Sequence, residues 1–277
     1  MGRREAGAVV VTGASSGIGR ATAVRLARPG ARLVLAARGE SGLRDVERVC
    51  ADRGAHVLVV PTDVTDAASV ARLVDAAVAR FGGIDVFVGA AAVWSYGRFE
   101  QTPPDVVRQV IETTLLGQLT CARAVLPALR ARRGTLVLVA SMYGRLASPL
   151  VSPYVAAKWG LVGFAEALRQ ELHGSGVDVV TVLPAAVDTP IYRHAANYTG
   201  RPLRPLPLMV GPGRVARAVE RSLRRPRRQV LVGRAHRVGV LLHDLAPGVY
   251  ERLARAAVPR LVLRDGDVPA HDGTVHR

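Results

Sequence analysis

The amino-acid sequence predicts an α/β fold built on a doubly wound parallel sheet, and three observations support this prediction. Short runs rich in Val and Leu alternate with longer amphipathic stretches as far as Pro184. The glycine-rich turn "TGASSGIG" at 12–19 directly follows the first of these runs. The apolar runs do not alternate with polar residues, which is typical of strands covered on both faces.

Strands and helices are expected to follow one another in turn along this part of the chain. Strands are expected at 8–13, 32–38, 56–64, 85–90, 134–141 and 177–184. Helices are expected at 19–30, 41–54, 66–83, 104–131 and 152–173. Because parallel strands are joined by right-handed crossovers, the helices should cover both faces of the sheet. The arrangement is a Rossmann-type, doubly wound parallel sheet.

The pattern changes after Pro184, where proline and glycine become frequent. We expect a substrate loop or lid at 188–213 and a small, basic C-terminal extension at 214–263. In this extension we expect a helix at 214–224, a strand at 229–233 and a helix at about 235–256. Residues 264–277 are expected to form an irregular tail. The sequence therefore predicts a single domain over 1–263.

The chain is strongly basic, and its cations are almost all arginine. It has 277 residues, a formal net charge of +16 and 38 Lys plus Arg, of which Lys158 is the one lysine. From residue 201 onward there are 16 Arg against 6 Asp plus Glu. This excess raises the hypothesis of an anionic partner, either nucleic acid or another anionic surface. The run "RRPRR" at 224–228 lacks the aromatic residues of a nucleic-acid platform, which favours arginines that are simply solvated.

The remaining composition favours a cytoplasmic protein without a transmembrane segment or a metal. No stretch reaches the roughly 18 uninterrupted apolar residues of a membrane-spanning helix. Cys50 and Cys121 lie far apart in expected helices, which indicates reduced thiols. No group of His, Cys and Asp has the spacing of a metal site. His173 and His194 are isolated, and we interpret them as structural or solvent-facing.

The glycine-rich turn predicts a dinucleotide-binding site. Gly13, Gly17 and Gly19 lie between the first strand and the first helix. Glycine allows a tight turn and the close approach of a pyrophosphate to the N-terminus of the helix. A glycine-rich turn is weak evidence by itself, but it is strong evidence between strand one and helix one. The expected cofactor contacts in this turn are Gly13, Ser15, Ser16, Gly17, Ile18 and Gly19.

The end of the second strand favours NADP over NAD. An acidic residue there would bind the ribose 2′-hydroxyl of NAD, but the chain has Arg38 and no acid before Glu40. A guanidinium pairs well with a 2′-phosphate, and Ser15 could add a hydroxyl contact. NAD stays possible, because Arg38 could instead be a solvated residue at the strand end.

A tyrosine and the lone lysine are placed to act together. Tyr154 and Lys158 are four residues apart on an expected helix, so their side chains share one face. A nearby ammonium is expected to lower the pKa of a phenol toward the working range. Ser141 lies 13 residues before Tyr154, at the carboxyl end of the fifth strand. Ligands bind at that end of an open parallel sheet.

At these positions the chain resembles the short-chain dehydrogenase/reductase family over about residues 1–195. The motifs that carry the resemblance are "TGASSGIG" (12–19), "TDVTD" (62–66), Ser141 with "YVAAK" (154–158), and "LPAAVDTP" (183–190). The resemblance implies hydride transfer between a nicotinamide and a carbonyl or alcohol carbon. Tyr154 would exchange the proton, Ser141 would hydrogen-bond the reacting oxygen, and Lys158 would hold the ribose and tune Tyr154. The further cofactor contacts that it implies are Asp63, Val64, Ala90, Tyr154, Lys158, Pro184, Val187 and Thr189.

The sequence departs from the family pattern at three places. "GAAA" at 89–92 replaces the family's Asn-Asn-Ala-Gly, which mainly braces the sheet. Thr114 stands where the family has a catalytic Asn, and a hydroxyl cannot offer both an amide donor and a carbonyl acceptor. Ala185 replaces a glycine. These changes leave a second hypothesis open, in which the chain binds NADP but has impaired catalysis and serves as a sensor or scaffold.

The expected pocket is apolar and aromatic. We expect a hydrophobic small-molecule alcohol or ketone to contact Trp94, Met142, Tyr143, Leu146 and Tyr154, although some of these side chains could serve only for packing. The family resemblance also implies a homodimer or homotetramer formed through the helices at 104–131 and 152–173.

Overall fold

The computed structural model describes residues 7–204, 208–233 and 236–276. Four short ranges lie outside the described residues: 1–6 and 234–235 of the predicted domain, 205–207 of the predicted loop, and 277 of the predicted tail. None of the helices in the described ranges is both long and apolar enough to cross a bilayer.

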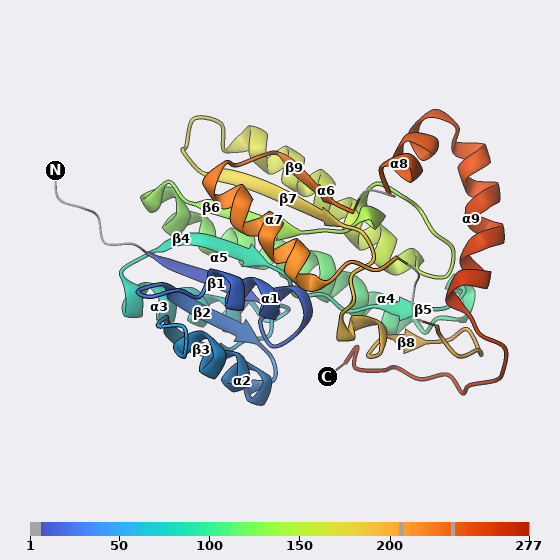
Figure 1. Ribbon diagram of the computed structural model, residues 1–277, viewed down its shortest axis with the longest axis horizontal. Helices are drawn as coiled ribbons and strands as arrows, with labels where there is room; N and C mark the ends of the chain where they lie inside the picture. The colour runs from blue at the N-terminus through green and yellow to red at the C-terminus, as the bar shows by residue number, and fades with distance from the viewer. Residues whose placement is uncertain (1–6, 205–207, 234–235, 277) are drawn as a thin grey trace.

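One sheet of parallel strands forms the centre of the molecule (Figure 1). Its strands are β1 (Ala8–Thr12), β2 (Arg32–Ala37), β3 (His56–Pro61), β4 (Ile84–Gly89), β6 (Thr135–Val139), β7 (Asp178–Pro184) and β9 (Gln229–Val232). The strand order is β3-β2-β1-β4-β6-β7-β9, and every neighbouring pair is parallel. The predicted doubly wound fold is confirmed. The order reverses between β1 and β4, which is where such sheets bind ligands.

Helices cover both faces of this sheet (Figure 1). One face carries α1 (Gly17–Leu26), α2 (Glu40–Ala51) and α7 (Pro212–Arg224), and the other carries α3 (Ala67–Phe81), α5 (Gly117–Arg132) and α6 (Ser152–Glu171). Successive side chains of β1 point to opposite faces of the sheet. Val10 belongs to the core under α3, α5 and α6, and Val11 to the core under α1, α2 and α7. Burial on both sides explains why the strands are continuous apolar runs.

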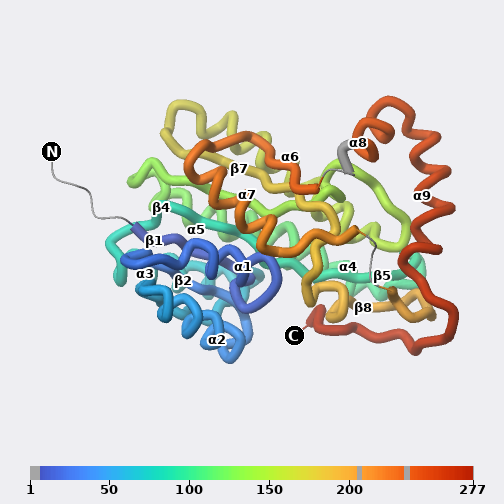
Figure 2. The backbone as a smooth tube through the Cα atoms, in the orientation of Figure 1, coloured from blue at the N-terminus to red at the C-terminus, as the bar shows by residue number. Residues whose placement is uncertain are grey.

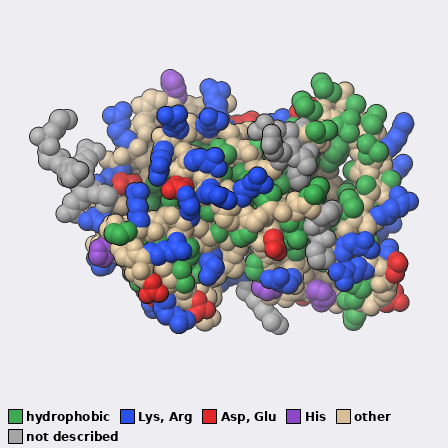
Figure 3. Space-filling model, viewed as in Figure 1, with side chains coloured by type: hydrophobic (Ala, Val, Ile, Leu, Met, Phe, Trp, Pro, Cys, Tyr) green, Lys and Arg blue, Asp and Glu red, His purple; other side chains and the backbone are tan. Residues whose placement is uncertain are grey.

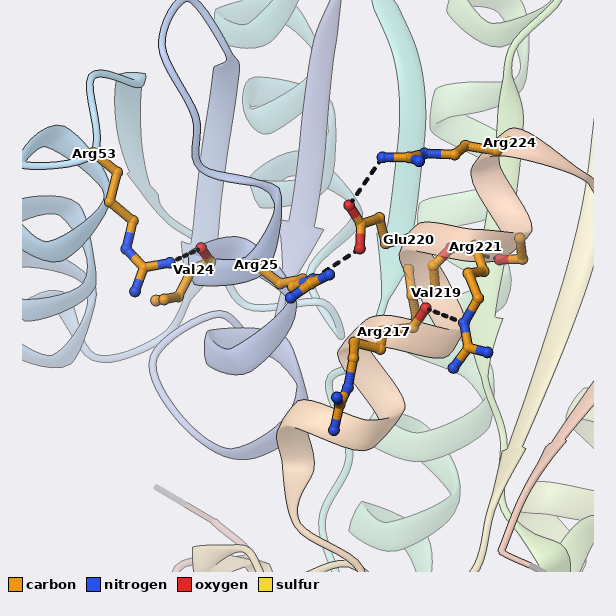
Figure 4. Close-up of polar contacts among 9 residues, drawn as sticks. Val24, Arg25, Arg53, Arg217, Val219, Glu220, Arg221 and Arg224 are labelled. Atoms are coloured by element: carbon orange, nitrogen blue, oxygen red, sulfur yellow. Dashed lines mark hydrogen bonds and ion pairs between the residues drawn. The ribbon is translucent and has the colours of Figure 1, made fainter.

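The helices α1 and α7 pack closely and share an ion-pair network (Figure 4). Glu220 on α7 accepts a hydrogen bond from Arg25 on α1 at 2.7 Å and one from Arg224 at 3.3 Å. Surface ion pairs contribute little to stability, about 0–1 kcal/mol. The buried residues Val215, Ala218 and Val219 therefore hold α7 in place more than this pairing does.

The long helix expected at 104–131 is interrupted. The structure has α4 (Pro104–Ile111), a π-helical turn at Glu112–Leu116 and then α5. Such single π-helical turns occur mostly inside α-helices and often at functional sites. Periodicity over a long window does not reveal an interruption of one turn, which explains the difference.

The second C-terminal helix is also divided in two. The structure has α8 (His236–Leu245) and α9 (Pro247–Val262) where one helix was expected at 235–256. Ala246 has φ −143° and ψ 64°, outside the helical region. It precedes Pro247, and proline disfavours helical backbone in the residue before it. The two helices form a hairpin beside the carboxyl end of the sheet (Figure 1).

A small second sheet was not expected from the sequence. It pairs β5 (Ser95–Tyr96) with β8 (Ala196–Asn197). The irregular tail after α9 returns along β8 toward the carboxyl end of the sheet (Figure 2). The backbone groups of Asn197 and His271 exchange two hydrogen bonds, at 2.8 and 3.1 Å. Short 3₁₀ turns lie at Phe99–Gln101, Met142–Gly144 and Pro190–Tyr192.

Candidate active site

A cavity of about 520 Å³ lies at the carboxyl ends of the strands, across the β1–β4 switch point. It brings together most of the residues that the sequence singled out: Gly13, Ser15, Ser16, Gly17, Ile18, Gly19, Arg38, Asp63, Val64, Ala90, Trp94, Ser141, Tyr154, Lys158, Pro184, Val187 and Thr189. Four others do not line it: Thr114, Met142, Tyr143 and Leu146. The cavity is large enough for a small-molecule or cofactor site.

The glycine-rich turn is shaped by contacts that exclude side chains. Gly13 and Gly17 have φ values of +65° and +52°, which favour glycine. A Cβ atom at Gly13 would lie 2.9 Å from the backbone of Ala90, and one at Gly19 would overlap the carbonyl of Gly13. Ser16 precedes α1 without a side-chain cap, and the first turn holds no acid. The positive end of α1 is therefore left for an anion, and the turn fits a dinucleotide pyrophosphate.

Arg38 and Glu40 differ in their partners at the end of β2. Arg38 is exposed and lines the cavity. Glu40 accepts hydrogen bonds from Arg44 at 2.8 and 3.1 Å, so its carboxylate is already engaged. Asp63, on the cavity wall at the end of β3, accepts from the amide and the hydroxyl of Thr65.

The three predicted catalytic side chains share one wall of the cavity. Ser141 follows β6, and its Oγ accepts a hydrogen bond from the amide of Tyr143 at 3.1 Å. Tyr154 and Lys158 lie on α6 and are 5% and 2% exposed. Lys158 Nζ donates to the carbonyl of Val139 at 2.9 Å and lies 5.4 Å from the ring centre of Tyr154. The end of β6 and the first two turns of α6 thus hold these three side chains in place.

Burial controls the proton affinity of this pair. It lowers the pKa of Lys158 to about 7, because a desolvated ammonium is costly. It raises the pKa of Tyr154 well above the usual value, and a hydrogen bond with Ser141 opposes that rise. The direction for Tyr154 is opposite to the one expected from the sequence. Desolvation outweighs the neighbouring lysine, whose own charge is disfavoured by the same burial.

An aromatic cluster covers Tyr154. The ring of Trp94 lies 4.0 Å from that of Tyr154, and its centre lies 5.3 Å from Tyr192 and 5.7 Å from Tyr143. Trp94 is 4% exposed, so it shields the phenol from water. The contact contributes to the burial that raises the pKa of Tyr154, and it makes the neighbouring cavity wall apolar.

Thr114 and Gln118 brace the segment after β4, where the family's asparagines are missing. Thr114 Oγ1 accepts from the amide of Val93 and donates to its carbonyl, both at 3.2 Å. Gln118 Nε2 donates to the carbonyl of Ala91 at 2.7 Å. The hydroxyl of Thr114 therefore supplies one donor and one acceptor to Val93, although it lacks the amide donor and carbonyl acceptor of an asparagine. Sequence reasoning missed Gln118, although its place one turn after Thr114 on the same helix was a usable signal.

The 188–213 segment, which is expected to form a substrate loop, contributes wall residues, and so does the tail, for which no such role was expected. Tyr192, His194 and Thr274 line the cavity. The amide of Thr274 donates to the carbonyl of His194 at 2.9 Å. His194 is exposed, which agrees with the interpretation of a solvent-facing histidine, and its exposed side chain lies at the cavity wall. No local pattern marks Thr274, because its position depends on the return of the tail.

The segment after Ser141 packs away from the cavity. Met142 and Leu146 are 3% and 6% exposed and belong to the core beside α6. Tyr143 reaches the site indirectly, through Trp94 and through an edge contact with Tyr154. His173 is exposed and lies outside this cavity. In the part of the chain that the structure describes, no three His, Cys, Asp or Glu side chains come together as metal ligands.

Known proteins show the same combination of sequence and fold. The model of the short chain dehydrogenase family matches residues 7–198. An uncharacterised oxidoreductase of Bacillus subtilis is 31% identical over 250 residues, which are 88% of this chain and 70% of that protein. A short chain dehydrogenase/reductase from Burkholderia phymatum, solved in complex with NAD, has a TM-score of 0.80 and 26% identity, covering 90% of this chain and 96% of that one.

A second solved structure is similar over nearly its whole length. It is a variant of the actinorhodin polyketide ketoreductase with NADPH, with a TM-score of 0.72 and 29% identity over 84% of this chain and 98% of that one. Residues 7–198, which the family model matches, include the glycine-rich turn, Ser141, Tyr154 and Lys158. The chain therefore belongs to the short-chain dehydrogenase/reductase family of oxidoreductases.

Proposed function

We propose that the chain is an NADP-dependent oxidoreductase that transfers a hydride between nicotinamide and the carbonyl or alcohol carbon of a hydrophobic small molecule. One observation carries the proposal: Ser141, Tyr154 and Lys158 line the same cavity as the glycine-rich turn. When bound, the cofactor supplies or accepts the hydride. The solved relatives described above hold NAD or NADPH, which supports a nicotinamide cofactor for this chain.

The side chains have distinct roles in this proposal. Tyr154 gives a proton to the substrate oxygen during reduction and takes one during oxidation. Ser141 donates a hydrogen bond to the same oxygen as charge develops on it. Lys158, in its ammonium form, uses one of its three donors on the carbonyl of Val139 and keeps the others for the ribose and Tyr154. The aromatic cluster around Trp94 excludes water and favours an apolar substrate.

The activity is tested by NADPH oxidation with a panel of ketones and aldehydes. We expect turnover by the unaltered chain, strongest with apolar substrates, and a loss on the order of 100-fold or more for Tyr154→Phe. Tyr198→Phe is the matched control, because Tyr198 is not on the cavity wall. Equal activity of Tyr154→Phe and the unaltered chain would contradict the proposed role.

The preference for NADP is proposed from the end of β2. Arg38 is exposed on the cavity wall, while Glu40 is engaged by Arg44. We expect Arg38→Ala to reduce the preference for NADPH over NADH by on the order of tenfold or more, because a charged hydrogen bond to phosphate is lost. Arg48→Ala on α2, which faces Asp45 instead, should leave the preference unchanged. An unchanged preference in Arg38→Ala would remove the basis for NADP.

The alternative function is an NADP-binding sensor or scaffold with impaired catalysis. It was based on Thr114 and the "GAAA" segment at 89–92. The hydrogen bonds of Gln118 to Ala91 in that segment and of Thr114 to Val93 directly after it support the catalytic proposal over this alternative. NADPH binding, followed by fluorescence, without turnover of any substrate would favour the alternative.

Assembly and location also stay as proposals. We propose a homodimer or homotetramer formed through the helices at 104–131 and 152–173. Exposed Leu116 (48%) and Trp159 (41%) on these helices support it. Light scattering with Trp159→Ser tests the interface. We further propose a cytoplasmic location, which fits the two buried free thiols.

A further inference from the structure

The hairpin of α8 and α9 exposes an unusual amount of apolar surface. On α8 the exposed side chains are Val238 (69%), Leu241 (59%) and Leu245 (82%), spaced so that they share one helix face. On α9, Val249 (49%) and Leu253 (56%) are exposed one turn apart, and Leu261 (45%) is exposed near the end of the helix and is not counted in this face. Hydrophobic side chains gather over both helices in the space-filling view (Figure 3). We call these five residues the apolar face of the hairpin.

Arginines lie next to this apolar face. Arg252, Arg255 and Arg260 on α9 are all exposed. Arg260 continues the stripe that Val249 and Leu253 begin, at helical spacing. Figure 3 shows Lys and Arg side chains along the outer edge of α9. This combination of apolar and cationic side chains is typical of helices that lie in the interface of an anionic membrane.

The acidic groups of the hairpin do not cancel this charge. Asp244 is paired with Arg145 at 3.1 Å, and Glu251 is the other acid in α8 and α9. The same ion pair ties the hairpin to the segment after Ser141, as does a hydrogen bond of 2.6 Å from the hydroxyl of Tyr250 to the carbonyl of Ala147. The hairpin is thus fixed to the body of the protein, close to the candidate site.

We propose that the apolar face and the three arginines beside it bind the surface of a membrane that contains anionic lipid. Solvation would explain the exposed arginines alone, but it does not explain the exposed leucines beside them. Anionic headgroups match the cations, and the acyl region takes the leucines. A second copy of the chain suits the face less well, because two-fold symmetry would bring the same arginines together.

The proposal is tested by flotation of the full chain with vesicles. The vesicles are phosphatidylcholine alone, or phosphatidylcholine mixed with phosphatidylglycerol. We expect binding to the mixed vesicles, little binding to phosphatidylcholine alone, and a decrease as salt is raised. Absence of binding to the mixed vesicles, or equal binding to both, would overturn the proposal.

Two pairs of variants separate the apolar and the charged contributions. Leu245→Gln with Leu253→Gln should lower the partition coefficient on the order of tenfold or more, since two apolar side chains that would enter the acyl region of the membrane are lost. Arg252→Gln with Arg255→Gln should lower it by a similar factor through lost attraction to anionic lipid. The matched controls are Phe99→Gln, whose side chain is 63% exposed elsewhere, and Arg214→Gln with Arg217→Gln on α7. Figure 4 shows Arg217 pointing away from α7.

Three outcomes of the variants would overturn the inference. If the leucine variant binds vesicles like the unaltered chain, the attraction is general electrostatics. The conclusion is the same if Arg214→Gln with Arg217→Gln binds vesicles as weakly as the hairpin arginine variant. If the leucine variant changes the sedimentation mass in the absence of vesicles, a second copy covers the face. The changed side chains are exposed, so folding should persist, and thermal unfolding checks this.

Discussion

Single side chains explain why the site tolerates its departures from the family pattern. Thr114 is fully buried, and its one hydroxyl satisfies both the amide and the carbonyl of Val93. Val93 directly precedes Trp94, which covers Tyr154. A hydroxyl in the π-helical turn therefore holds the backbone that positions the aromatic cluster. Thr114 acts on the site through this segment and does not line the cavity.

Replacement of Thr114 tests this bracing. Thr114→Val keeps the shape but leaves two buried backbone groups without a partner, so the free energy of unfolding should fall by about 1–3 kcal/mol for each. Thr114→Ser keeps the hydroxyl and should lose much less. Urea denaturation of the two variants measures the difference. Equal stability of the two would mean that the hydroxyl contributes nothing.

Lys158 is the one lysine of the chain, and its surroundings explain why an arginine would not serve. Its side chain is 2% exposed and its Nζ donates to Val139. Lys158→Arg conserves charge, but the broad guanidinium does not fit a space packed around an ammonium. We expect turnover to fall on the order of 100-fold or more, measured as kcat for NADPH oxidation. Near-full turnover, with the fold intact, would mean that a fixed ammonium is not required.

At the scale of elements, the site is closed by segments that are far apart in sequence. The tail runs back along β8 and places Thr274 on the cavity wall. Gly273 makes this possible, because it has φ +56° and its Cβ position lies 2.6 Å from the carbonyl oxygen of Ala195. The tail therefore depends on a glycine at this position for its close approach to β8.

Alanine at Gly273 tests whether the tail shapes the pocket. Gly273→Ala should push the tail from β8 and raise the KM for the carbonyl substrate severalfold, with NADPH affinity unchanged. Gly266→Ala is the matched control, since Gly266 also has a positive φ (+119°) but its Cβ position is 3.6 Å from the nearest atom, on Pro202. Both variants also force an alanine into a positive φ, which costs about 1–3 kcal/mol in each. Identical kinetics for the two would show that the tail does not affect the substrate.

At the scale of the whole molecule, the buried charge of Lys158 couples stability to pH. Its pKa is about 7 in the fold, against an ordinary value of about 10.4. Between these values the unfolded chain binds more protons than the folded chain, so stability rises with pH. Cys121 acts in the opposite direction from about pH 8.5 upward, because burial raises its pKa to about 12. The effect of Lys158 is therefore clearest between about pH 7 and 8.5.

The pH dependence is measurable without cofactor. The free energy of unfolding should rise by up to about 1.4 kcal/mol per pH unit in that window. Lys158→Met removes the titrating group and should flatten the curve while leaving the fold intact. Urea denaturation at several pH values measures the slope. An unchanged slope in Lys158→Met would assign the dependence to other groups.

Much of the site could be predicted because its parts are local in sequence. The glycine-rich turn, the four-residue spacing of Tyr154 and Lys158, and the strand that ends before Ser141 are all visible in short windows. The alternation of buried strands and helices determines the parallel sheet, and the sheet brings the carboxyl ends of β1, β4 and β6 together. The sequence by itself therefore determined the family and the fold, and it predicted the side chains that share the cavity wall.

Only the tertiary structure decided the features that depend on contacts between distant segments. Thr114 meets Val93 across 21 residues, and Thr274 meets His194 across 80. Burial raises the pKa of Tyr154, and the packing of α8 and α9 leaves the face of the hairpin exposed. Local patterns record helical and strand periodicity, whereas burial and long-range pairing exist only once the chain has packed.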